Sequence, residues 1–285
     1  MSDVFSSVVP VVDPTSNLVV VYWDLYPGAI ARDADPDFYV EVARSVDATW
    51  TRLNPTNPVN GVCQYVDDDE ELKGCKWQVL FRIVMDLNSV ETASDPVGMY
   101  EAGLRQERLL LAELERRAYV GLNSSGVHGY FLHKKDFGTA CSCVDPDLDT
   151  PGIPNCPDCF GTGLEGGYYL KVESAARLLE PGTFSRKETG MLGVEASDDI
   201  ALEALCHPRV FPDDVWVSRD SGKMYRIGNQ TQISAAFRDM PILLQMKATL
   251  LDPSDIMYTF DLSDYGIPLA DNDQILLTED DEEIT

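Results

Sequence analysis

Four cysteines lie close together in the glycine-rich segment 138–169. Cys141 and Cys143 form a CxC pair, and after twelve intervening residues Cys156 and Cys159 form a CxxC pair. A CxxC turn brings two sulfurs onto one metal ion, and the glycines after Cys159 free backbone amides to turn toward the thiolates. The spacing therefore favours a metal site over a redox centre or a disulfide.

Zinc is the metal that this ligand set predicts. Zinc accepts four thiolates without redox chemistry, and its binding would order a loop that has too few apolar residues to fold alone. Most zinc ribbons and knuckles use CxxC twice, so the tighter CxC pair leaves open whether all four cysteines share one ion. His128 or His133 could replace one ligand, and a disulfide or an iron–sulfur role stays as an alternative. We expect a structural zinc ion held by Cys141, Cys143, Cys156 and Cys159.

No other group of residues predicts catalysis. Four cysteines would close a zinc site, whereas catalytic zinc keeps an open position and a nearby base. The segment offers Asp145, Asp147 and Asp149 but no HxE element, and its glycines are not followed by the Lys-Ser/Thr of a phosphate loop. Cys206 and His207 are adjacent, so on a regular element they would point to different faces, with Cys206 in the core. We expect no enzyme activity, no catalytic residue and no cofactor-binding residue.

The chain is strongly acidic, with 48 acidic against 22 basic residues and a formal net charge of -26. Like-charge repulsion opposes a general affinity for phosphates, so we expect no specific nucleic-acid partner. The acidic runs 67–71 and 279–283 are typical of a solvated loop and a solvated tail. We expect a protein made in the cytosol without a membrane partner, because the sequence lacks a signal-peptide pattern and any long apolar run.

β-Structure is predicted for the first domain, residues 1–92. Three apolar or alternating runs predict its strands: 19–23, 38–44 and 77–85. The order of these runs resembles a fibronectin type III or immunoglobulin-like sandwich, in which Trp23 and Trp77 would lie in the inter-sheet core. Cys63 and Cys75 could form a disulfide, but in a chain made in the cytosol we expect free thiols.

A long helix is predicted to connect the first domain to the rest, at residues 93–122. Ser94 or Asp95 would cap its start, Pro96 suits the first turn, and the helix would end near Gly121. About 24 residues at 1.5 Å each would make it a strut of roughly 36 Å. Such a helix could pack on its own chain or form an interface between subunits.

The cysteine module is assigned to 123–170 and a second β domain to 171–265. In that domain we expect three features, a hairpin at 214–228, a buried strand at 240–251 and a further strand at 255–262. A small barrel or sandwich is the expected product, followed by an acidic arm at 266–285. The predicted fold class is mainly β.

Two stretches resemble virion structural proteins of tailed bacteriophages, of the kind found at the neck or head–tail junction. They are CPDCFGTGLEGGYY at 156–169 and the run that begins DVWVSRDSGKMYRIG at 214–260. The similarity covers roughly residues 120–265. It implies a non-enzymatic subunit that assembles into a homo-oligomeric ring or collar with other virion structural proteins, in a virion assembled in the host cytoplasm.

A second function class is an adaptor or chaperone-like binding module that contains zinc. The motif CxxCxGxG is also the repeat unit of the cysteine-rich region of a heat-shock co-chaperone family. That family carries several such repeats, whereas this chain has one full copy. Baseplate and other tail proteins also contain related-looking β domains, so a baseplate or tail position is a further alternative.

Overall fold

The structure is a computed structural model and is mainly β, as predicted. It describes residues 4–12, 18–26, 28–56, 59–60, 64–67, 72, 79–99, 105–145, 150–151, 155–169, 171–179, 199–207, 209–237, 240–260 and 262. The predictions for Cys63, Cys75 and Trp77, for the acidic residues 68–71 and for the arm 266–285 lie outside these residues.

The N-terminal lobe, residues 4–99, contains two antiparallel sheets. The first sheet has the order β1 (Phe5–Val12), β2 (Val19–Leu25), β6 (Gln64–Asp67). The second has the order β4 (Thr51–Arg52), β3 (Asp37–Ala43), β7 (Leu80–Leu87), β8 (Val90–Ala93), with β5 (Val59–Asn60) beside β3 and β9 (Val97–Gly98) beside β7. The runs predicted at 19–23, 38–44 and 77–85 thus contain strands β2, β3 and β7.

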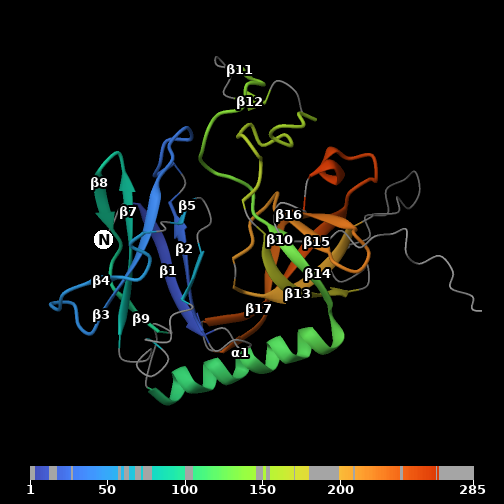
Figure 1. Cartoon of the computed structure of the whole chain (residues 1–285). Coiled ribbons are helices and arrows are strands. Elements are labelled where there is room, and N and C mark those ends of the chain that lie inside the picture. The colour runs from blue at the N-terminus through green and yellow to red at the C-terminus, as the bar shows by residue number, and fades with distance from the viewer. Residues whose placement is uncertain are drawn as a thin grey trace, which may run out of the picture.

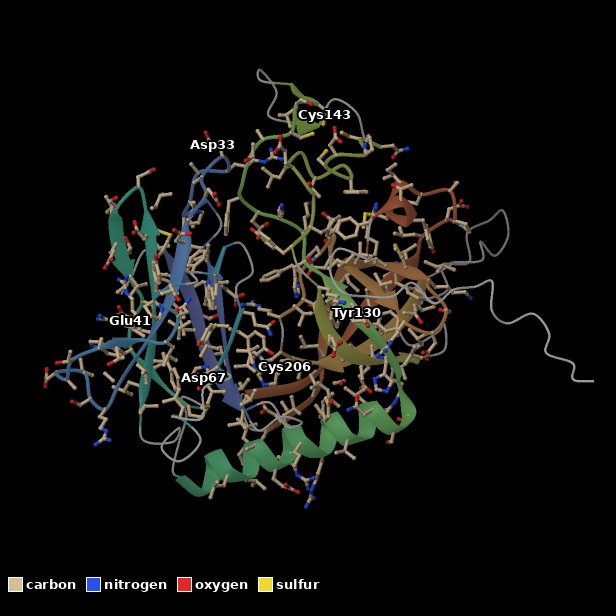
Figure 2. The ribbon with its side chains drawn as sticks, viewed as in Figure 1. Asp33, Glu41, Asp67, Tyr130, Cys143 and Cys206 are labelled. Atoms are coloured by element: carbon tan, nitrogen blue, oxygen red, sulfur yellow. The ribbon has the colours of Figure 1, made fainter. Side chains whose placement is uncertain are left out.

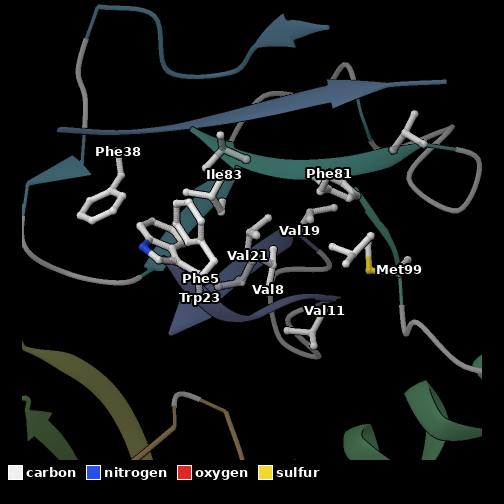
Figure 3. Packing of buried hydrophobic residues seen from close by; sticks show 14 of the residues in the cluster. Phe5, Val8, Val11, Val19, Val21, Trp23, Phe38, Phe81, Ile83 and Met99 are labelled. Carbon is white, nitrogen blue, oxygen red and sulfur yellow. The ribbon is translucent and has the colours of Figure 1, made fainter. Parts of the chain in front are cut away.

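Side chains from both sheets form one core in this lobe (Figure 3). Alternate residues point inward because side chains of a strand alternate between its faces. The rings of Phe38 and Trp23 are in contact, with centroids 5.4 Å apart and planes tilted by 50°, and both residues are almost fully buried. On the opposite face of β3, Glu41 accepts from Arg52 at 3.0 Å and Arg82 at 2.8 Å, so this buried carboxylate is paired across two neighbouring strands.

Helix α1 (Arg105–Ser125) has 21 residues and runs along both lobes (Figure 1). The predicted start at Ser94, Asp95 and Pro96 is wrong. The Ser94 hydroxyl accepts from the Ile83 amide at 2.9 Å and the Ser94 amide donates to the Ile83 carbonyl at 2.8 Å, so this serine extends the sheet rather than capping a helix. The helix ends later than Gly121, and the Gly126 amide donates to the Leu122 carbonyl at 2.6 Å.

A closed six-stranded barrel forms the second lobe. Its order is β10 (Val127–Leu132), β13 (Val172–Leu179), β14 (Asp199–Leu205), β17 (Met240–Leu250), β16 (Met224–Phe237), β15 (Val215–Ser218), all antiparallel. The hairpin predicted at 214–228 is β15 with the start of β16, and Gly222 takes a φ of 63 in its turn. The strand predicted at 240–251 is β17.

The strand predicted at 255–262 is wrong, because Ile256–Thr259 form a short 3₁₀ helix, η3. The Asp255 carboxylate caps this helix by accepting from the Met257 amide at 3.0 Å. Met257 is fully buried and lies in a cluster with Val215 and Val217 on the outer face of β15. The apolar run that the sequence predicts as a strand is thus a short helix that packs against the outer face of the barrel.

The barrel wall is buried on both faces near η3. Phe131 and Trp216 point into the barrel, whereas their strand neighbours Tyr130, Val215 and Val217 point to the η3 side. The backbone of β10 passes so close to β15 that a Cβ on Gly129 would lie 2.3 Å from the Val217 carbonyl. Only glycine fits there.

The two lobes share one hydrophobic core. The cluster that contains Trp23 and Phe38 extends to Leu111 of α1, Ile242 of β17 and Tyr169. At the same junction, Arg209 donates to Asp24 at 2.7 Å. In the part of the chain that the structure describes, no helix is long and apolar enough to cross a membrane.

Candidate metal centre

The cysteine segment is an excursion between barrel strands β10 and β13 (Figure 1). It carries a two-stranded sheet, β11 (Val144–Asp145) with β12 (Thr150–Pro151), at its tip. The module predicted at 123–170 therefore includes one strand of the barrel, β10. Barrel strands β10 and β13 hold the two ends of the excursion, so a few cross-links within the segment would be enough to keep its shape.

The structure brings all four predicted cysteines together. Their sulfur atoms all lie within 4.8 Å of one another. The Sγ atoms of Cys141 and Cys156 are 3.7 Å apart, and those of Cys143 and Cys159 are 3.5 Å apart. The CxC pair and the CxxC pair thus interleave around one point, and Figure 2 shows Cys143 at the end of the molecule where this excursion lies.

The two shortest separations are close to those of a tetrahedral metal site. Zinc–sulfur bonds of about 2.3 Å place two sulfurs about 3.8 Å apart at the corners of a tetrahedron. A disulfide requires sulfurs at about 2.05 Å, and the four cysteines are free thiols. The arrangement is compatible with one structural metal ion bound by all four residues.

A tight turn lets the CxC pair place both sulfurs on the same side. The Val144 amide donates to the Cys141 carbonyl at 3.0 Å, which closes a turn over Cys141, Ser142 and Cys143. In an extended strand residues 141 and 143 would also share a face, but the turn brings them closer together. The Cys141 amide donates to the Gly163 carbonyl at 2.9 Å and so anchors this turn to the CxxC loop.

Glycines let the CxxC loop fold around its own sulfurs. Gly161 and Gly163 have φ values of 81 and 82, in the left-handed region that favours glycine. Their amides donate to the Cys159 sulfur. The Thr162 hydroxyl donates to the Cys159 carbonyl at 2.8 Å. Backbone donors thus surround a sulfur that would carry negative charge when it binds a metal.

The backbone also changes the acidity of the thiols. Donation from the Asp158 amide, aided by the Cys159 amide and opposed by burial, lowers the pKa of Cys156 to about 7. Burial, and hydrogen bonds that the Cys143 thiol donates to the neighbouring sulfurs, raise the pKa of Cys143, and burial raises the pKa of Cys159. The thiolate of Cys156 is favoured and those of Cys143 and Cys159 are disfavoured, so a divalent cation would supply the charge that lets Cys143 and Cys159 ionise.

The two histidines considered as replacement ligands have other roles. His133 Nδ1 lies 2.8 Å from Oδ2 of Asp214, a buried carboxylate that also accepts the Lys134 amide at 2.9 Å. His128 lies in β10, where its carbonyl accepts the Arg219 amide at 2.9 Å. Among the described residues, neither histidine belongs to the group around the four sulfurs.

The N-terminal lobe holds the excursion in place. Arg32 donates to the Thr162 carbonyl at 2.7 Å, and its own carbonyl accepts the Gly138 amide at 2.8 Å. Phe137 lies between Phe38 and Tyr169, with ring distances of 6.1 and 5.9 Å. Sequence reasoning missed these contacts, because an arginine more than a hundred residues away carries no local signal.

Cys206 is buried, as predicted, but the separation expected between Cys206 and His207 is not found. Both residues follow β14 in a bend rather than in a strand, so strand alternation does not apply. Their ligand atoms and a carboxylate oxygen of Glu115 all lie within 4.8 Å of one another. Sequence reasoning missed Glu115, since a single glutamate in a charged helix gives no distinguishing pattern.

A comparison of the chain with protein-family models and with curated proteins finds no match.

Proposed function

We propose that the chain is a structural subunit of a tailed-bacteriophage virion, a neck or head–tail connector component. It would hold a zinc ion between Cys141, Cys143, Cys156 and Cys159, which we call the four-cysteine clip. The observation that carries the zinc assignment is the close approach of the four thiol sulfurs, which lie within 4.8 Å of one another, with two pairs at 3.5 and 3.7 Å. A closed set of four thiolates suits a structural ion rather than catalysis. The N-terminal lobe would be the immunoglobulin-like module of such a subunit.

The two stretches that resemble phage proteins form one unit in the fold, which supports this proposal. Tyr168, at the end of the cysteine stretch, packs in a cluster with Val217 and Met224 of the 214–228 hairpin. The Tyr168 hydroxyl donates to the Asp213 carbonyl, at 3.4 Å. A resemblance carried by two separate stretches is more informative when the stretches pack together.

The charge of the chain suits a channel through which DNA passes. A ring of chains with a formal charge of -26 each would repel phosphates rather than bind them. Helix α1 would supply part of a subunit contact, since Leu109, Leu110 and Val120 are exposed on it. Their apolar side chains are large enough to contribute to an interface.

The assembly test is native mass spectrometry of the purified full chain over a range of concentrations. We expect a closed oligomer of defined size, because ring components bury complementary surfaces on each neighbour. A chain that stays monomeric at all concentrations, alone and with phage neck proteins, would contradict the connector proposal. Selective binding of unfolded polypeptide by such a monomer would favour the chaperone-like alternative.

Removing one clip ligand tests the zinc assignment separately. We expect Cys156→Ser and Cys159→Ser to lose the zinc ion of the clip and to expose residues 138–169 to protease. Ser142→Ala is the matched control, because Ser142 lies in the same turn and its side chain is exposed. Zinc content by elemental analysis and limited proteolysis are the measurements. Unchanged zinc and protection in both cysteine variants would reject the clip.

A further inference from the structure

A second group of potential metal ligands lies at the junction of the two lobes. Glu115 of α1 and Cys206, at the end of β14, are buried, and His207 retains some exposure. One oxygen, one sulfur and one nitrogen from these side chains lie within 4.8 Å of one another. Figure 2 shows Cys206 between the lobes, above helix α1.

Each of the three residues is held in place by a different part of the fold. Glu115 lies on the same buried face of α1 as Leu111 and Leu122. The Cys206 amide donates to the Ile242 carbonyl at 3.1 Å, which ties it to the start of β17. The His207 ring stacks on Tyr22 of β2, with ring centroids 5.5 Å apart and planes 15° apart.

The ligand set has the chemistry of a zinc-type ion. Zinc binds thiolate, imidazole and carboxylate, with bonds of about 2.0 to 2.3 Å, and three protein ligands leave one position for water. Such bonds place ligand atoms about 3.3 to 3.8 Å apart, so these side chains would close by at most about 1.5 Å. Rotation of three side chains covers that movement.

We infer that Glu115, Cys206 and His207 form a second metal site, which binds a divalent transition-metal ion of the zinc class. The Cys206 thiol donates to the Pro241 carbonyl at 2.9 Å. Binding the ion replaces this hydrogen bond by a metal–sulfur bond, and the thiol proton passes to solvent. The ion fastens α1 to the end of β14, and through His207 it supports the contact with β2.

This site does not depend on the proposed function. The ion would be a clamp between the lobes whether or not the chain assembles into a ring. The site also differs from the four-cysteine clip in its ligands, because only one of them is a thiolate. Variants of each site therefore separate the two ions.

The experiment measures zinc per chain in the full-length protein. The protein is equilibrated with Zn²⁺, excess metal is removed by gel filtration, and the metal is counted by elemental analysis. We expect Glu115→Gln and Cys206→Ser each to lose one zinc ion per chain relative to the unaltered protein. Glu113→Gln is the matched control, since Glu113 lies on the outer side of the same helix and pairs with Arg116 at 2.9 Å.

Cobalt in place of zinc provides a second measurement. We expect the thiolate-to-cobalt absorption of the Cys156→Ser variant to fall by the contribution of one thiolate ligand when Cys206→Ser is added. Glu115→Gln keeps the shape of the side chain, so a loss of metal without a change in circular dichroism points to ligation rather than unfolding. Zinc content that is the same in the unaltered protein, Glu115→Gln and Cys206→Ser would overturn the inference.

Discussion

The sulfur of Cys159 accepts hydrogen bonds from the backbone amides of Gly161 and Gly163. Both glycines have a left-handed backbone conformation. Cysteines alone therefore do not make this site. The loop must also aim its amides inward, and glycine does so at little cost. Gly167 is needed for a second reason: its φ is 63, and a Cβ there would lie 2.7 Å from the Cys159 carbonyl oxygen.

Replacing Gly167 tests how far the clip depends on its backbone. We expect Gly167→Ala to weaken zinc retention and to lower the melting temperature, because the new Cβ clashes with the Cys159 carbonyl. Gly222→Ala is the control, since Gly222 has the same φ of 63 but open space around it. It should cost about 1 kcal/mol from the left-handed backbone alone. Equal effects of both variants in a chelator competition and a thermal melt would show that the clash is unimportant.

Helix α1 shows how an element depends on its neighbours. Residues with helical spacing and good caps are present from Ser94 onward, but β7 competes for the same backbone groups. Ser94 bonds to Ile83 in the sheet, and Val97 pairs with Phe81. Sheet pairing wins because it satisfies several backbone groups at once, whereas a cap satisfies only one.

Most of the stability that helix α1 gives the folded chain should come from the side chains on its buried face. Leu122 is 1% exposed and Val120, two residues earlier on the same helix, is 50% exposed. We expect Leu122→Ala to lower the free energy of unfolding by about 2 to 5 kcal/mol, from lost burial and the cavity left behind. Val120→Ala should stay within about 0.5 kcal/mol of the unaltered chain. Urea denaturation followed by circular dichroism measures both, and a large effect at Val120 in the monomer would contradict the assigned helix face.

The two lobes are linked at several points across the molecule. Their shared core includes Leu111 and Ile242, the Asp24–Arg209 ion pair lies at the junction, and Arg32 holds the cysteine excursion. The N-terminal sheets are therefore packed against the barrel and α1. A lobe that loses its partner would expose part of its apolar core.

We expect the full chain to unfold in one transition, because the lobes share buried side chains. Ile242→Ala should lower the midpoint of that transition without splitting it, since Ile242 is 5% exposed in the common core. Lys223, an exposed residue in the turn of the barrel hairpin, offers a control as Lys223→Ala. Differential scanning calorimetry is the measurement. Two resolved peaks in the unaltered chain would show that the lobes unfold independently.

Local chemistry in the sequence was enough to predict several features. The four clip cysteines, the hairpin around Gly222, the strands β2, β3 and β17 and the mainly β class all follow from short-range patterns. A CxxC turn, a glycine turn and an alternating run each act over a few residues, so neighbours in the sequence carry the signal. The zinc ion and the virion role stay predictions.

Only the tertiary structure decided the rest. The CxC pair joins the CxxC pair because the segment before it hydrogen-bonds to the loop after the CxxC pair, through the Cys141 amide to the Gly163 carbonyl and the Glu165 amide to the Thr139 carbonyl. Ile256–Thr259 form a 3₁₀ helix instead of a strand because Met257 fills a position over β15. Glu115, Cys206 and His207 meet because α1 packs across the end of β14. Each outcome depends on residues that are distant in the sequence, and their contacts exist only once the chain has folded.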